Sequence, residues 1–428
     1  MATEYRYSDT VLRQVRKLLF IPFLLLSAVA SAAECDSIAI PKVGIEVRYT
    51  PAQTLCIDKE PRIWTKTKET HAIAAQVNIT PTENDFARDY NYPTFSVGLR
   101  YNLNHATTMH KDTPWGEAQP VDYTSKLGNF LTLYGTFNRP LYRSEHWQWG
   151  YYLGTGVGYT SLKYNQKNNI DNEYIGSHLN IFFTAGLYGQ YKVAKEWSIK
   201  AGLDFAHHSN GAMARPNKGA NYLGPFLGVV YEPEKETTKV AKGNTNHKDP
   251  FQKYWFTEFT LGIGGKTLLE DWQQTQFETP QGHPDYRREQ FAFYGAYSFH
   301  THLLYRYARR WASGVGFGLF YGDYISRVAQ HDKEHGYTGE KHSPWSLSIE
   351  GRHEIFYGNM SVRVSLGYYL YRHMGYKSRN GLERPYHEQV GVFYSFPKLK
   401  NLTLGFSVNA HATKADFTEL QITMPVKL

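Results

Sequence analysis

Long stretches of the chain alternate apolar and polar residues with a period of two. The clearest example runs from Trp197 to Ser209, where the odd positions hold Trp, Ile, Ala, Leu, Phe, His and Ser, and the even positions hold mostly small or polar residues. A period of two is that of a β-strand whose two faces differ in polarity. Similar segments recur from residue 43 to the end of the chain, so the pattern predicts an all-β, antiparallel fold.

The alternation predicts two sets of about eight strands. The first set is expected at 43–50, 71–80, 93–104, 129–138, 148–163, 178–192, 196–209 and 220–231. The second set is expected at 254–265, 289–306, 310–326, 344–356, 359–372, 387–396, 400–413 and 416–427. Eight is the smallest common strand number of a membrane barrel, and an even number returns the chain to its starting side. We favour two eight-stranded barrels in tandem, with one larger barrel as the alternative.

Two segments set the expected domain limits. Residues 1–33 combine basic residues, an apolar run shorter than the ~20 residues of a spanning helix, and a small-residue end, which predicts a secretory signal peptide. Residues 232–250 are rich in charge, and Val240 is their only large apolar residue, which predicts a linker. The expected domains are therefore a first barrel over 34–231 and a second barrel-like half over 251–428.

Composition favours a transmembrane barrel over most soluble classes. Aromatic residues make up 16% of the chain, with 34 tyrosines and 36 glycines, and the mean hydropathy is −0.52. Membrane barrels combine such richness with low hydropathy because only every second residue of a strand faces lipid. The formal net charge of +8 favours a phosphate-bearing lipid surface. We expect no nucleic-acid partner, and a soluble secreted sandwich that binds carbohydrate stays open as an alternative.

Cysteine and histidine patterns bear on covalent links and metals. Cys35 and Cys56 are the only cysteines, and in an exported chain we expect them to form one disulfide. His331 and His335 have the spacing of a helical metal pair, but they stand in a charged stretch that we predict to be a solvated loop. We therefore expect neither a metal nor a cofactor.

A candidate catalytic group lies at the end of the strand predicted at 196–209. His207 and Ser209 continue its apolar face, which suggests that they act on a lipid. The next predicted strand places Asn221 on the same face, and antiparallel pairing would bring it near His207. His207 is then the candidate base, Ser209 the nucleophile and Asn221 the group that orients the base. The backbone N–H groups of Asn210 and Gly211 are candidates for an oxyanion hole.

The run His207-His208-Ser209-Asn210, followed by Asn217-x-Gly219 and Asn221, resembles the motif region of the outer-membrane lipid A 3-O-deacylases, the PagL-like family. The resemblance covers roughly residues 70–232 and is most specific toward its end. More broadly, the whole chain resembles longer acyloxyacyl hydrolase-type proteins. The family implies an eight-stranded barrel that hydrolyses the ester-linked acyl chain at the 3-position of lipid A. It uses a Ser-His-Glu triad on the lipid-facing wall, in the outer leaflet.

The resemblance implies that His207 is the general base, that Ser209 is the nucleophile and that Asn210 lies beside the oxyanion hole. One position departs from the family, because Asn221 stands where the acidic triad member is expected. Asparagine can accept a hydrogen bond from imidazole but supplies no negative charge. Asp204 is an alternative acid, although it falls on the other face of the strand. We expect an outer-membrane serine esterase that takes lipid A or lipopolysaccharide as substrate, as a monomer or a homodimer. The alternative is a catalytically degenerate structural or pore-like barrel.

The second half contains a comparable His-x-Thr pair, His411 and Thr413. Its apolar residues occupy the even positions from Leu402 to Ala412, so His411 and Thr413 fall on the polar face. This register is opposite to that of His207 and Ser209. We therefore expect no catalytic motif in residues 251–428.

Overall fold

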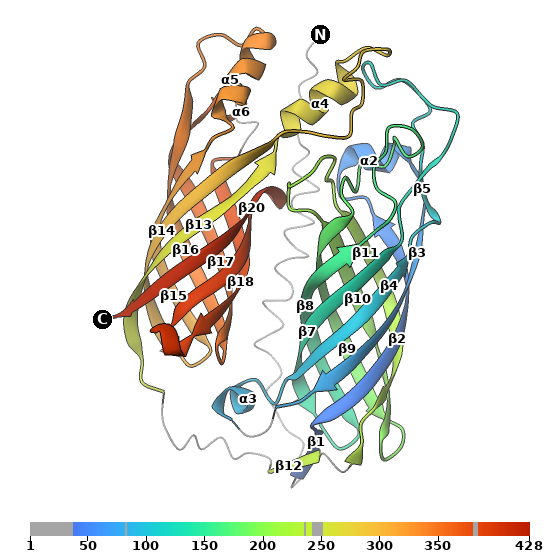
Figure 1. The fold of residues 1–428 in the computed structure, drawn as a ribbon. Coiled ribbons are helices and arrows are strands. Elements are labelled where there is room, and N and C mark those ends of the chain that lie inside the picture. The colour runs from blue at the N-terminus through green and yellow to red at the C-terminus, as the bar shows by residue number, and fades with distance from the viewer. Residues whose placement is uncertain (1–36, 82–83, 235–236, 242–250, 380–383) are drawn as a thin grey trace.

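In the computed structural model, two closed antiparallel β-barrels stand side by side (Figure 1). The structure describes residues 37–81, 84–234, 237–241, 251–379 and 384–428. The predicted signal peptide and Cys35 of the predicted disulfide lie outside these residues. Within these ranges, no helix has the length and apolarity needed to cross a membrane.

The first barrel has eight strands and is closed because β2 pairs with both β3 and β11. Its strands are β2 (Val43–Leu55), β3 (Thr65–Ile79), β4 (Thr94–Leu103), β7 (Phe130–Arg143), β8 (Trp147–Tyr159), β9 (Leu179–Lys192), β10 (Trp197–Ser209) and β11 (Ala220–Tyr231). Beyond the barrel, β5 (Thr107–Met109) pairs with β3 and with β6 (Ser125–Lys126). The predicted linker contains a strand, β12 (Thr237–Ala241), which pairs with β1 (Ser37–Pro41).

The second barrel is closed by pairing between its first and last strands. Its strands are β13 (Tyr254–Thr267), β14 (Phe293–Ala308), β15 (Trp311–Gly322), β16 (His342–Tyr357), β17 (Met360–Met374), β18 (Tyr386–Phe396), β19 (Leu402–His411) and β20 (Lys414–Lys427). Every strand predicted from the alternation overlaps one of these or one of the first barrel. The prediction of two barrels rather than one larger barrel is confirmed.

Short helices lie in the connections between strands. They are α2 (Lys59–Trp64), α3 (Asp85–Asp89), α4 (Leu269–Phe277), α5 (Ile325–Glu334) and α6 (Tyr376–Arg379), with a 3-10 turn, η3 (Pro397–Leu399). Helix α5 corrects the prediction of a solvated loop around His331. The helix forms because Ile325 and Val328 pack against the buried apolar cluster at this end of the second barrel. The imidazole rings of His331 and His335 stack with centroids 4.0 Å apart.

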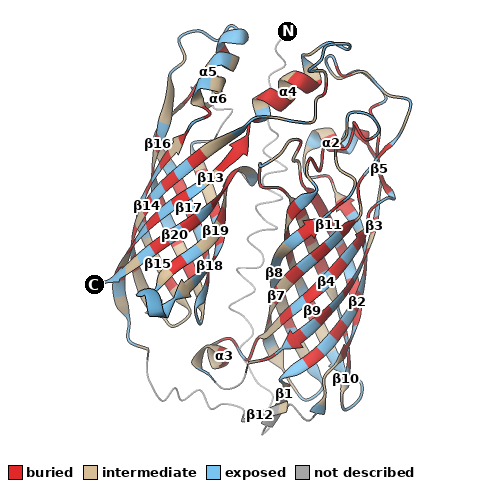
Figure 2. Cartoon of the chain, in the orientation of Figure 1, coloured by how far each residue is buried: buried red, intermediate tan, exposed pale blue. Residues whose placement is uncertain are grey.

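The strands expose apolar residues and bury polar ones. On β2, Ile45, Val47 and Tyr49 are 53%, 51% and 46% exposed, whereas Glu46 and Arg48 between them are buried. Figure 2 shows this alternation as a chequered pattern over both barrels. An outer wall of exposed apolar side chains is the reverse of a soluble fold and is typical of a barrel that crosses a membrane.

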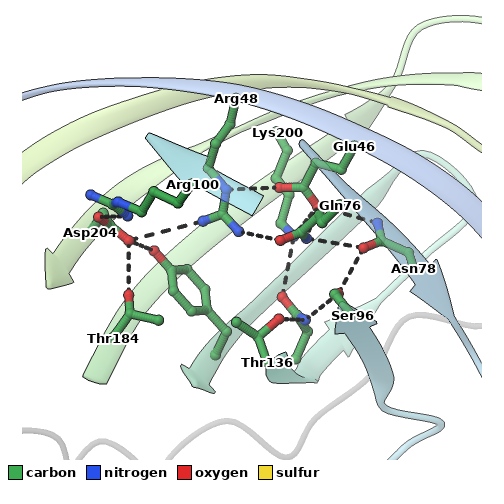
Figure 3. A network of polar contacts seen from close by, with 12 residues as sticks. Glu46, Arg48, Gln76, Asn78, Ser96, Arg100, Thr136, Thr184, Lys200 and Asp204 are labelled. Atoms are coloured by element: carbon green, nitrogen blue, oxygen red, sulfur yellow. Dashed lines mark hydrogen bonds and ion pairs between the residues drawn. The ribbon is translucent and has the colours of Figure 1, made fainter. Parts of the chain in front are cut away.

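A network of paired charges fills the lumen of the first barrel (Figure 3). Lys200 Nζ donates a hydrogen bond to Glu46 Oε2 at 3.0 Å, and Arg48 Nε lies 3.3 Å from Glu46 Oε1. Arg100 Nη1 donates to Asp204 Oδ2 at 2.7 Å. Pairing offsets the large cost of burying each charge. The Asp204 carboxylate is buried in the lumen and bound to Arg100. It does not contact His207, whose side chain is on the other face of β10.

The second lumen is filled in a similar way. Glu258 accepts hydrogen bonds from Arg352 at 3.3 Å and from Arg363 at 3.1 Å, and Arg363 also donates to Glu354 at 2.9 Å. All four side chains are buried. Both lumens therefore contain buried, paired charged side chains.

Candidate active site on the outer wall

Strands β10 and β11 position the candidate site. In their antiparallel pairing, His207 lies directly opposite Asn221. His207 and Ser209 share the outward face of β10 with Leu203, which is 54% exposed. The structure thus brings His207 and Asn221 together on the outer wall. This adjacency follows from the register of β10 and β11, which are consecutive in the chain and are joined by the loop 210–219.

A hydrogen bond of 2.7 Å joins His207 Nδ1 to Asn221 Oδ1. The Asn221 amide is oriented by its Nδ2, which donates to the carbonyl oxygen of Gly219 at 3.4 Å. Because an amide oxygen only accepts, the proton in the first bond belongs to His207 Nδ1. Nε2 of the same ring is then the unprotonated nitrogen that can take a proton. Asn221 is buried, although its register is outward, because it packs against His207 and Gly219.

Ser209 ends β10, two residues after His207, and its side chain is half-buried. Two steps along a strand separate the Cα atoms of the two residues by about 6.6 Å. Across the neighbouring strand β9, Ser209 pairs with Ile181. Among the described residues, the structure gives no hydrogen bond between Ser209 and His207, so it places the two on one face of β10 without joining them. A serine hydroxyl and an imidazole on an apolar wall are the groups that could attack an acyl ester carried by a lipid.

Gly219 allows His207 to occupy its position. Its φ is +72°, and a Cβ atom at Gly219 would lie 2.6 Å from Cε1 of the His207 ring. Any larger residue would push the imidazole away from Asn221. The sequence showed Gly219 only as part of the motif, because the contact with His207 depends on how the connecting loop folds back.

The neighbouring histidine has a structural role. His208 points into the lumen, where its ring stacks on Phe130 at 4.0 Å and its Nε2 lies 2.9 Å from Thr132 Oγ1. The side chain is fully buried. His208 is therefore separated from Ser209 by the barrel wall.

The loop after Ser209 contains the two candidate oxyanion-hole residues. The N–H of Asn210 donates to Asn217 Oδ1 at 3.0 Å, and Asn210 Oδ1 accepts from the N–H of Ala214 at 3.2 Å. The Asn210 amide would therefore have to leave Asn217 in order to bind an oxyanion. Gly211 has a φ of +61°, in the left-handed region that glycine adopts readily. The roles of Asn210 and Gly211 stay predictions.

The second barrel contacts the same loop. Thr418 Oγ1 donates to the carbonyl oxygen of Gly211 at 2.8 Å. The N–H of Thr267 donates to the carbonyl oxygen of Ala212, also at 2.8 Å. Arg215 Nη2 donates to the Thr267 carbonyl oxygen at 3.1 Å. The sequence analysis missed Thr267 and Thr418, although both are polar residues at outward positions of their strands, where apolar residues are the rule.

In the second half, the two ring nitrogens of His411 face Tyr369 and Asp416, with Nδ1 3.6 Å from Asp416 Oδ2. His411 Nε2 lies 2.9 Å from Tyr369 OH, and Thr413 is in the turn between β19 and β20. His335 Nε2 lies 2.7 Å from Glu278 Oε2. In the part of the chain that the structure describes, no group of three histidine, cysteine, aspartate or glutamate side chains is arranged to hold a metal ion.

Comparisons with known proteins identify both halves. Residues 74–230 match the family lipid A 3-O-deacylase (PagL), and residues 255–427 match the family acyloxyacyl hydrolase, C-terminal domain. Curated proteins give no match.

Solved structures similar to the chain include outer-membrane proteins. A BenF-like porin from Pseudomonas fluorescens Pf-5 is 11% identical, with a TM-score of 0.21 over 92% of this chain and 99% of the porin. The alcaligin outer membrane receptor FauA from Bordetella pertussis is 9% identical, with a TM-score of 0.27 over 91% of this chain and 65% of the receptor. Scores this low carry no argument, so the assignment of the fold depends on the strand pairing.

Proposed function

Since the chain is a two-part outer-membrane β-barrel protein, with a PagL-family lipid A 3-O-deacylase domain followed by an acyloxyacyl hydrolase C-terminal domain, we propose that it removes the ester-linked acyl chain at the 3-position of lipid A. The observation that carries the proposal is the hydrogen bond between His207 and Asn221 on the outer wall, beside Ser209. The exposed apolar belt around this wall supports a substrate that stays in the membrane.

In the proposed first step, Ser209 Oγ attacks the carbonyl carbon of the ester while His207 Nε2 takes the hydroxyl proton. Asn221 Oδ1 holds the Nδ1–H side of the ring throughout. Backbone amides of the loop after Ser209 face the oxyanion that forms. When the tetrahedral intermediate collapses, the bond to the sugar oxygen breaks and His207 returns its proton to that oxygen. The products are the sugar hydroxyl and an acyl ester on Ser209.

In the second step, water attacks the acyl-Ser209 ester, and His207 Nε2 accepts a proton from the water. Collapse of this intermediate returns the proton to Ser209 Oγ and releases the fatty acid. The sum of the two steps is hydrolysis of one ester bond. Neither step needs a metal or a cofactor.

The packed lumens argue against a pore, which was the passive alternative considered from the sequence. The ion pairs of Asp204 in the first barrel and of Glu258 in the second are buried in the lumens, where a water-filled pore would leave charged side chains exposed to solvent. A catalytically degenerate structural barrel is the second candidate function. A homodimer stays a prediction from the sequence.

The test is deacylation of purified lipid A by the detergent-solubilised protein, followed by mass spectrometry. Wild type is expected to release one 3-O-linked acyl chain, and Ser209→Ala to release none. Ser144→Ala, in the turn between β7 and β8, is a control for serine replacement and is expected to match wild type. If wild type that is folded as a heat-modifiable barrel leaves lipid A unchanged, the degenerate barrel replaces the esterase.

A further inference from the structure

Two threonines of the second barrel break the rule that outward side chains are exposed. Thr418 shares the outward face of β20 with Leu420, which is 63% exposed, yet Thr418 is only 4% exposed. Thr267 shares the outward face of β13 with Ile263, which is 61% exposed, yet Thr267 is only 3% exposed. These threonines are on adjacent strands, since Gly265 of β13 pairs with Thr418. What covers them is the loop that follows Ser209 in the first barrel.

Each threonine holds one carbonyl group of this loop. Thr418 Oγ1 donates to the Gly211 oxygen at 2.8 Å. Thr267 donates twice to the Ala212 oxygen, from its N–H at 2.8 Å and from Oγ1 at 3.0 Å. Two consecutive peptide groups, two and three residues after the proposed nucleophile, are thereby bonded to the other barrel.

The fit between the loop and Thr418 is close. A Cβ atom at Gly211 would lie 2.1 Å from Thr418 Oγ1 and 3.2 Å from Ile181 Cδ1. Gly211 also has a left-handed φ, so the loop depends on glycine for both its conformation and its approach to β20. Arg215 adds a third contact by donating two hydrogen bonds to the Thr267 carbonyl oxygen.

Fixing a carbonyl group also fixes the amide that shares its peptide plane. In a trans peptide the C=O and N–H bonds point in opposite directions. With the Gly211 oxygen directed at Thr418, the N–H of Ala212 points away from the second barrel. The peptide groups from Gly211 to Met213 are therefore fixed by contacts with the second barrel. The N–H of Met213 donates to the Asn210 oxygen at 3.2 Å, which ties the same segment to a candidate oxyanion-hole residue. A loop fixed on the far side of Gly211 limits the arrangements open to the Asn210 and Gly211 amides, and preorganised amides stabilise an oxyanion.

We propose that the second barrel acts as a positioning element for the active site, with Thr418 and Thr267 as positioning residues that hold the loop after Ser209 in its catalytic conformation. The inference rests on the proposed esterase function. It explains why a barrel without a catalytic motif of its own accompanies the deacylase barrel.

The test compares kcat and KM for lipid A deacylation in four variants. Thr418→Val removes the hydroxyl and keeps the shape, and Thr418→Ser keeps the hydroxyl. Thr267→Val/Thr418→Val removes both hydroxyls. Tyr90→Phe is the matched control, because it removes an inter-barrel hydrogen bond, from Tyr90 OH to the Phe356 oxygen at 2.9 Å, at the opposite ends of the barrels.

Thr418→Val is expected to lower kcat about tenfold, which is less than the hundredfold or more that follows loss of a direct oxyanion donor. KM is expected to change less than twofold, Thr418→Ser to restore kcat, and the double variant to lose more. Hydrogen exchange measured by mass spectrometry should be faster for the amides of residues 211–214 in Thr418→Val and in the double variant than in wild type. Tyr90→Phe should leave both readouts unchanged.

Equal kcat in wild type and the double variant, with unchanged exchange over residues 211–214, would overturn the inference. A loss of kcat in Tyr90→Phe equal to that in Thr418→Val would also overturn it, because general loosening of the two barrels would then explain the effect. If wild type shows no deacylation, the proposed function fails. The exchange data then decide by themselves whether the second barrel holds the loop.

Discussion

At the scale of the residue, the proposed base His207 has a neutral partner, Asn221. Asn221 holds the His207 ring through Oδ1 but offers no charge to the imidazolium that forms when Ser209 loses its proton. In a serine protease, the change from aspartate to asparagine costs roughly 10⁴-fold in kcat. That loss reflects the wrong tautomer, whereas Asn221 Oδ1 accepts from His207 Nδ1 and leaves Nε2 free, so we expect a smaller loss here, from the missing charge alone.

Asn221→Glu tests this limit. We expect kcat for lipid A deacylation to rise about tenfold or more, because a carboxylate would stabilise the imidazolium. Asn221→Ala is the control, and we expect its kcat to fall below that of wild type because His207 loses its partner. The rates are measured as acyl release by mass spectrometry. An Asn221→Glu protein that is folded but no faster than wild type would contradict the role assigned to Asn221.

Gly219→Ala tests how tightly the His207 ring is held. The added Cβ would lie 2.6 Å from Cε1 of the ring, so we expect the ring to move and kcat to fall about a hundredfold, as small misplacements of catalytic groups do. Gly336→Ala controls for backbone strain, since Gly336 has a φ of +74° with nothing within 4 Å of its added Cβ. Its kcat should equal that of wild type. Equal activities of the two variants would show that the contact does not matter.

At the scale of the element, the two faces of strand β10 differ: one carries the proposed catalytic residues and the other carries buried polar residues. His207 and Ser209 are on the outer wall, while Asp204 and His208 are buried in the lumen. The lumen face is stabilised by polar contacts that cross the barrel, such as that from Arg100 to Asp204 at 2.7 Å. The outer face is thereby held in place by the packing behind it.

Asp204→Ala is expected to destabilise the first barrel by about 3–5 kcal/mol, because it leaves the buried Arg100 without its carboxylate partner. The free energy is obtained from urea unfolding in detergent, followed by the heat-modifiable gel shift. Asp112→Ala is the control, since Asp112 forms an exposed pair with Lys66 outside the barrel. Its unfolding midpoint should match that of wild type. A similar midpoint for Asp204→Ala would mean that the lumen network adds little.

At the scale of the whole molecule, loops of the two halves share a buried arginine. Arg287, in the connection between α4 and β14, donates to Asp171 Oδ1 at 3.0 Å and to the Ile170 oxygen at 3.1 Å in the first half. It also donates to Gln276 Oε1 at 3.1 Å in its own half. The guanidinium is fully buried, so the loops are joined by a contact that water does not weaken.

Arg287→Ala is expected to free both loops, since it leaves the Asp171 carboxylate buried without its cation, at a cost of about 3 kcal/mol or more. Hydrogen exchange should become faster over residues 162–175 and 275–289 together. Arg288→Ala is the matched control, because the neighbouring Arg288 pairs with Asp285 at the surface. Faster exchange in only one of the two segments would show that Arg287 does not couple them.

The period-two alternation determined much of this molecule. It predicted both barrels, their sixteen strands and the outward face of β10, because a strand with lipid on one side and a polar lumen on the other must alternate. It also predicted the neighbours His207 and Asn221, since they face each other across one short hairpin. These features depend on residues that are close in the sequence or on the pattern within one strand.

Only the tertiary structure decided the rest. The helix at His331 forms because α5 docks on a barrel end, and the contact of Gly219 with His207 depends on the path of a loop. The contacts of Thr267 and Thr418 with the loop after Ser209 join residues more than fifty and two hundred positions apart. Alternation shows which face of a strand points outward. It does not show which part of one barrel contacts the other barrel, because that contact depends on how the two folded barrels pack together.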